Sequence, residues 1–197
     1  LPAGVGLSVL AGPILQLLYP AVPETAEAAA YHLTFLGLAC VFVCLMVATN
    51  GVLQAYGHPL LPVISLLCGG VLKIVTNYLM VGDPATGIRG AAVSTLYCYA
   101  LIAVINLAAI ARLVPERPGY ISLFAKPVLL TAVMALAARS GYGVFCRLLP
   151  ESWAVLPAVL LAAVVYVVLA LAIGAVTRQD LQTLPKGEKL ADRLHLR

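Results

Sequence analysis

The feature that most constrains the fold of this chain is a series of long apolar segments separated by short polar stretches. Six can be marked, at residues 1–19, 30–55, 60–81, 91–113, about 121–138 and 153–176. An α-helix rises about 1.5 Å per residue, so roughly 20 apolar residues cross about 30 Å of hydrocarbon. Membrane strands would instead alternate apolar and polar residues over about 10 positions. The pattern therefore predicts an all-α, polytopic membrane helix bundle.

Composition agrees with this prediction. Hydrophobic residues make up 62% of the 197 residues and charged residues only 10%, whereas a soluble domain carries about 25% charged residues. The net charge is +4, but the basic residues stand at segment ends and in the C-terminal tail. A soluble basic face for nucleic acid is not indicated, so we expect no nucleic-acid partner.

Two of the six segments, the first and the fifth, are less regular than the others. The chain starts with Leu1 inside an apolar segment that has neither a basic leader nor a small-residue cleavage site. We therefore expect no signal peptide and interpret the sequence as a piece of a longer protein. In the fifth segment Lys126 and Pro127 stand near the start and Arg139 near the end. This segment is predicted either to tilt or to continue toward Phe145.

The distribution of lysine and arginine predicts the orientation. Eight of the 12 basic residues fall on one side of the predicted bundle, namely Arg112, Arg117, Lys126, Arg178, Lys186, Lys189, Arg193 and Arg197. The opposite side holds Arg89, Arg139 and Arg147. By the positive-inside rule the first side is cytoplasmic. We expect a multi-pass protein of the cell membrane with a cytoplasmic C-terminus.

Lys73 is the first candidate functional residue, because it lies inside the third apolar segment. A charged side chain at membrane depth is costly and persists against partners or water. Asn77 stands four residues later, on the same helix face, so the pair is predicted to bind an anionic headgroup such as a phosphate or pyrophosphate. The alternative is that Lys73 extends its stem to the outer interface, although about 12 Å of helix separates it from that end.

Three other amides inside the predicted membrane region have a simpler interpretation. Asn50, Gln54 and Asn106 either line a water-accessible cavity or form hydrogen bonds between helices, each worth well under 2 kcal/mol. Small residues gather at positions 69–70 and 87–94. They predict close approach of helices, and the alternative is a hinge for alternating access.

Signatures of other chemistry are missing from the sequence. It holds no GxxxxGK[ST], HExxH or GxSxG motif, and all eight acidic residues lie in predicted loops or the tail. Cys40 and Cys44 are one helical turn apart, but no second pair or histidine stands at a metal-ligand spacing. We therefore expect no enzyme, no catalytic residue, no cofactor and no metal.

Several stretches resemble one known family. LPAGVGLSVLAGPILQLLYP, NGVLQAYGHPLLP, KIVTNYLMVGDPATGIRGAAVSTLYCY and the tail TRQDLQTLPKGEKLADRL resemble the MOP flippase superfamily. The resemblance is to its polysaccharide-export and stage V sporulation protein B branch, which is similar to lipid II flippases. It covers nearly the whole chain in order, and Lys73 matches a lysine associated with this branch.

The resemblance implies a fourteen-helix transporter of two lobes, of which this chain would be the last six helices. Residues 1–113 would belong to the C-terminal lobe, 114–176 to an additional two-helix hairpin, and 177–197 to a cytoplasmic tail. It further implies a flippase for a polyprenyl-phosphate-linked saccharide or peptidoglycan precursor in cell-envelope synthesis or sporulation, working by alternating access. Its partners would be that substrate, membrane lipids and the missing N-terminal lobe. The alternatives are a cation-coupled multidrug exporter of the MATE type, disfavoured because no carboxylate lies in a predicted membrane segment, or a non-transporting membrane scaffold.

Overall fold

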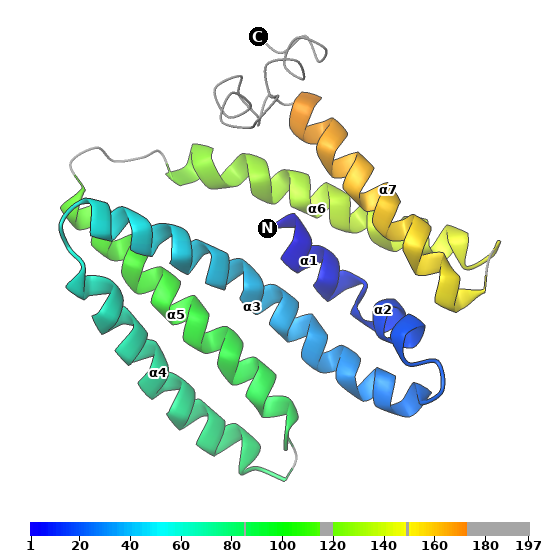
Figure 1. Ribbon diagram of the computed structural model, residues 1–197, viewed down its shortest axis with the longest axis horizontal. Helices are drawn as coiled ribbons and strands as arrows, with labels where there is room; N and C mark the ends of the chain where they lie inside the picture. The colour runs from blue at the N-terminus through cyan, green and yellow to red at the C-terminus, as the bar shows by residue number, and fades with distance from the viewer. Residues whose placement is uncertain (85, 115–119, 149, 173–197) are drawn as a thin grey trace.

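The structure is a computed structural model that describes residues 1–84, 86–114, 120–148 and 150–172, all of which lie in helices or their connections. The helices are α1 (Pro2–Val9), α2 (Ala11–Leu18), α3 (Pro23–Ala55), α4 (Leu60–Val81), α5 (Arg89–Leu113), α6 (Tyr120–Phe145) and α7 (Glu151–Ala172). Figure 1 shows them as an elongated bundle. The predicted tail, residues 177–197, lies outside the described residues, as do residues 115–119 between α5 and α6.

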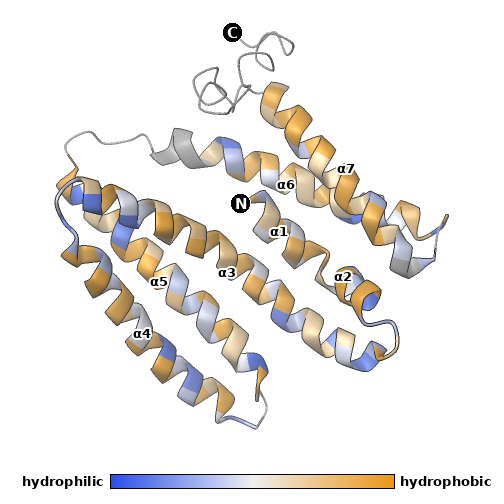
Figure 2. Cartoon of the chain, in the orientation of Figure 1, coloured by the Kyte–Doolittle hydropathy of each residue, from blue (hydrophilic) through white to orange (hydrophobic). Residues whose placement is uncertain are grey.

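The predicted membrane bundle is confirmed. Among the described residues, five helices are long and apolar enough to cross a membrane, which are α3, α4, α5, α7 and the part of α6 from Ala125. Their outward faces carry large apolar side chains, such as Leu60 at 72% exposure and Leu160 at 68%. Figure 2 shows that apolar residues predominate along these helices and that hydrophilic residues interrupt them on α4. Such exposure is costly in water but natural in hydrocarbon, which indicates that lipid covers these faces.

The first apolar segment departs from the single helix that we predicted. It folds as α1 and α2, which are separated at Leu10, where the backbone turns to φ −103° and ψ 15°. Pro13 explains the break, because it has no N–H to donate to the Val9 carbonyl and its ring crowds the preceding turn. Each piece has 8 residues, too few to span the membrane alone.

Two other boundaries differ from the predicted segments. α3 begins at Pro23 and has 33 residues, so the acidic stretch that we expected to be a loop forms its first turns. Proline is well suited to the first helical position, and Glu24 in the first turn complements the helix dipole. α6 runs on to Phe145, which confirms the second of the two possibilities for the fifth segment.

α5 is the central helix of one half of the bundle, because it packs along both α3 and α4, whereas α3 and α4 touch each other little. On the other side of α3, the broken α1–α2 helix crosses it closely. A Cβ on Gly4 would lie 2.6 Å from the Gly37 carbonyl oxygen, so both glycines are needed for this approach. α6 and α7 form a hairpin that packs against α1 and α2 and not against α3, α4 or α5 (Figure 1).

Candidate functional site

The face of α4 that carries Lys73 is the face that packs against α5. Gly69 lies one turn before Lys73 and is buried, and a Cβ there would overlap the Ile102 side chain of α5. At the far end, a Cβ on Gly90 would lie 2.6 Å from the Met80 Cβ. The small residues therefore act as predicted at these two positions, by letting the helix axes approach.

Lys73 is half-buried along this contact. It is close enough to the Cys98 thiol of α5 to interact with it electrostatically. Within the described part of the chain, its ammonium group makes no hydrogen bond or ion pair. It stands eight residues before the end of α4 at Val81, or about 12 Å along the helix. The structure thus places a cation at membrane depth without an anionic partner among the described residues.

Asn77 continues the same line of residues and is bound to α5. Its Oδ1 accepts a hydrogen bond from the Ser94 hydroxyl at 3.1 Å, and Ser94 is fully buried. Half of the predicted site is therefore engaged in holding α4 to α5. In the sequence, Ser94 stands out only as one of several small residues, and nothing there marks Cys98 as a neighbour of Lys73.

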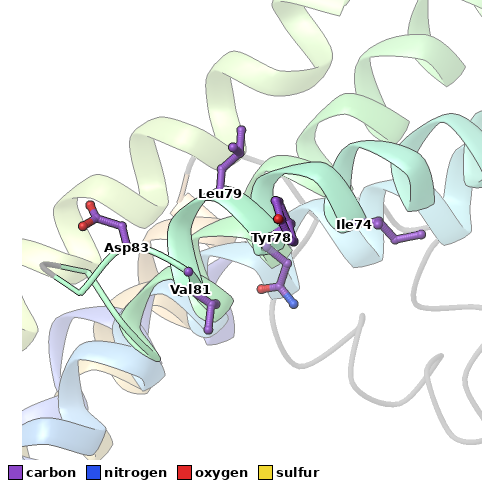
Figure 3. A pocket seen from close by; sticks show the side chains of 7 residues that line it. Ile74, Tyr78, Leu79, Val81 and Asp83 are labelled. Atoms are coloured by element: carbon purple, nitrogen blue, oxygen red, sulfur yellow. The ribbon is translucent and has the colours of Figure 1, made fainter.

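Asn77 also borders a broad, open hollow at the end of α4, with a volume of about 760 Å³. The described residues that line it are Ile74, Asn77, Tyr78, Leu79, Val81, Gly82 and Asp83, and Figure 3 shows Tyr78 and Asp83 among them. Tyr78 is 81% exposed. Lys73 is not one of the described residues that line the hollow, so the structure brings only Asn77 of the predicted pair to this surface.

The other membrane amides form helix contacts rather than a cavity. The Asn106 Nδ2 of α5 donates to Asn50 Oδ1 at 2.7 Å and to Thr49 Oγ1 at 3.1 Å, both on α3. Asn106 is fully buried, and its Oδ1 has no partner in the described structure. Gln54 is exposed. For Asn50 and Asn106, the hydrogen-bond interpretation is thus the one that the structure supports.

A second concave surface lies between the α1–α2 helix and the α6–α7 hairpin. It has a volume of about 410 Å³ and is almost wholly apolar, with Gly6, Leu10, Met134 and Tyr166 among its lining residues. Such a groove suits hydrocarbon. α3 and α5 separate it from Lys73, so the two features do not form one continuous site (Figure 1).

The cysteines remain free thiols, and Cys40 and Cys44 are both exposed on α3. Among the residues that the structure describes, no three histidine, cysteine or acidic side chains gather as metal ligands would.

Comparison with known proteins supports the membrane assignment and adds a distant relative. No family model matches the chain, and no solved structure matches it. The chain is 26% identical over 194 residues to the uncharacterized membrane protein YabM of Bacillus subtilis strain 168. This similarity covers 96% of the chain but only 35% of YabM. The chain thus spans about a third of the length of the curated relative, and it is a multi-pass membrane protein of helical type.

Proposed function

We propose that the chain is the C-terminal part of a flippase that moves a polyprenyl-phosphate-linked saccharide or peptidoglycan precursor outward across the cell membrane. The observation that carries this proposal is Lys73, a half-buried cation in a membrane-spanning helix without an anionic partner in the described structure. An intramembrane cation of this kind is commonly part of a substrate pathway. The family resemblance of the surrounding sequence directs the proposal to a lipid-linked anion.

In this proposal Lys73 contacts the phosphate or pyrophosphate of the substrate while the substrate crosses the membrane. Asn77, one turn nearer the end of α4, offers its Nδ2 to the same headgroup while its Oδ1 stays bonded to Ser94. The reaction is translocation by alternating access between two lobes, with no bond made or broken. We propose that the other lobe is supplied by the remainder of a longer protein.

The test measures translocation of the lipid-linked precursor in membrane vesicles that contain the full-length protein to which this chain belongs. It compares wild type with Lys73→Ala and Lys73→Arg at equal amounts of each protein in the membrane. Charge-assisted contacts are worth about 1.5–3 kcal/mol, so Lys73→Ala should slow transport about ten- to a hundredfold. Lys73→Arg keeps the charge and should retain part of the activity. Lys126→Ala is the control. Lys126 is exposed on α6, so this variant should transport the precursor at the wild-type rate.

Two results would redirect the assignment. Normal transport by both Lys73 variants would make Lys73 a structural residue and remove it from the site. A wild-type parent that moves no lipid-linked precursor, but exports small amphiphiles in exchange for a cation, would favour the multidrug-exporter alternative. A parent that moves neither kind of substrate would favour the scaffold.

A further inference from the structure

A small pocket with both polar and apolar walls lies where α4 turns into α5, and Lys73 is not among the described residues that line it. Three helices and the turn form it, and its volume is about 170 Å³. Its lining residues are Tyr31 of α3, Met80 of α4, Thr86 of the turn, and Arg89, Gly90 and Val93 of α5. Liquid water occupies about 30 Å³ per molecule. The pocket is therefore large enough for a phosphate group with a few waters, and too small for a whole lipid headgroup with its glycerol and chains.

Arg89 is the charged wall of this pocket. Its guanidinium carbon lies 5.3 Å from the centroid of the Tyr31 ring, a cation–π contact that orients the group. Within the described residues, the guanidinium makes no hydrogen bond or ion pair. A cation–π contact uses none of the guanidinium N–H groups in a hydrogen bond, so they stay available to a bidentate acceptor. Arg89 is thus an exposed arginine beside Tyr31 whose donors have no acceptor in the described part of the chain.

The Thr86 hydroxyl and the backbone amides at the start of α5 are already engaged. The Thr86 hydroxyl donates to the Met80 carbonyl oxygen. The backbone N–H groups of residues 89–91 donate to carbonyls three residues earlier, at 3.1–3.2 Å. His32 Nε2 lies 3.3 Å from the Ile88 carbonyl oxygen and ties this turn to α3. The backbone N–H groups at the start of α5 are therefore not available to a ligand. The attraction for an anion comes from Arg89.

We propose that the pocket formed by Tyr31, Thr86 and Arg89 binds a phosphate group through the in-plane donors of Arg89. A planar guanidinium matches two oxygens of a phosphate, so we expect phosphate to bind more tightly than a spherical anion. α4 has 22 residues and spans about 33 Å, so its end reaches the level of lipid headgroups. The phosphate belongs either to a lipid headgroup at this surface or to a free phosphate ion. The inference does not depend on the transported substrate.

The test uses the purified full chain in neutral detergent and measures its unfolding midpoint as each ligand is added at constant ionic strength. A ligand that binds only the folded chain raises the midpoint with its concentration, which yields an apparent dissociation constant. The probes are inorganic phosphate and dihexanoyl phosphatidic acid. Sodium chloride and dihexanoylglycerol, which carry no phosphate, are the matched reference ligands.

We expect the wild type to be stabilised by at least one phosphate probe and by neither reference ligand. Arg89→Ala should weaken that binding about ten- to a hundredfold, Arg89→Lys should weaken it less, and Tyr31→Leu should weaken it by removing the cation–π contact. Stabilisation by both probes identifies free phosphate as sufficient, and stabilisation by phosphatidic acid alone identifies the lipid headgroup. Arg147→Ala is the control, because Arg147 is an exposed arginine on the turn after α6.

Three outcomes would overturn the proposal. They are a wild type that neither phosphate probe stabilises, an Arg89→Lys variant that binds both probes as tightly as the wild type does, and an Arg147→Ala variant that loses as much affinity as Arg89→Ala. The unliganded midpoint of each variant reports its folding. If Arg89→Ala is itself unstable, the comparison of Arg89→Lys with the wild type decides, since lysine keeps the charge and loses the bidentate geometry.

Discussion

The Ser94 hydroxyl of α5 donates a hydrogen bond to Asn77 Oδ1 of α4 over 3.1 Å. This bond lies one helical turn from Lys73. It joins α4 to α5, and Lys73 lies along the contact between these two helices. Three pairs of facing residues succeed one another at four-residue intervals, which run in opposite directions along the two helices. They are Gly69 with Ile102, Lys73 with Cys98, and Asn77 with Ser94. The environment of Lys73 is thus set by an antiparallel helix contact of defined register.

The hydrogen bond between Ser94 and Asn77 should contribute measurably to folding. A double-mutant cycle of Ser94→Ala and Asn77→Ala, unfolded by titration in mixed micelles, should give a coupling free energy of about 0.6 kcal/mol, and not above about 1.7 kcal/mol. The value is modest because the unfolded helices also find partners in the micelle. Strictly additive effects of the two substitutions would show that the bond is absent in the folded protein.

Gly69 and Gly70 should respond very differently to the same substitution. A Cβ on Gly69 would overlap the Ile102 side chain, whereas a Cβ on Gly70 meets nothing within 4 Å. Gly69→Ala should therefore lower the free energy of unfolding by about 1–3 kcal/mol, and Gly70→Ala should leave it unchanged or raise it by up to about 1 kcal/mol.

Shortening the opposing side chain provides the check on that explanation. Ile102→Ala leaves a gap that the new methyl group partly fills, so the double variant Gly69→Ala, Ile102→Ala should be more stable than the sum of its single effects predicts. Equal destabilisation by Gly69→Ala and Gly70→Ala would refute the proposed close approach.

Asn106 should be intolerant of a negative charge. It is fully buried, and its two hydrogen bonds are donated by Nδ2 to oxygens of Thr49 and Asn50. Asn106→Asp replaces that donor with an acceptor and places a charge at membrane depth, which should cost about 3 kcal/mol. Gln54→Glu introduces the same charge on an exposed side chain of α3 and should cost much less. The same micelle titration measures both, and similar losses for the two variants would contradict the buried position of Asn106.

Much of the architecture was predictable because membrane insertion depends on local composition. In hydrocarbon, every backbone N–H and C=O group needs a hydrogen-bond partner within its own segment. Long apolar segments therefore form helices regardless of which other helices pack beside them. The helical ranges 60–81 and about 91–113 follow almost directly from this rule. The small residues Gly69 and Gly90 also predicted a close contact between helices, although the sequence did not indicate which helix would be the partner.

Other features needed the tertiary structure, because they depend on which faces of different helices meet. The lengths of apolar segments cannot reveal that α5 packs between α3 and α4, that Asn106 of α5 bonds to Asn50 of α3, or that Arg89 makes a cation–π contact with Tyr31. The break at Leu10 was open to prediction from Pro13 but was missed, since a proline in a membrane helix can also leave it merely kinked.

The sequence by itself determined that the chain forms membrane-spanning helices, roughly where they start and end, and that Lys73 lies inside one of them. Only the tertiary structure decided that Lys73 is half-buried beside α5, that Asn77 is bonded to Ser94, and that Tyr31 orients Arg89. The physical reason is that transfer into hydrocarbon is a property of each segment alone, whereas side-chain partners depend on the shapes and register of helices that are distant in sequence.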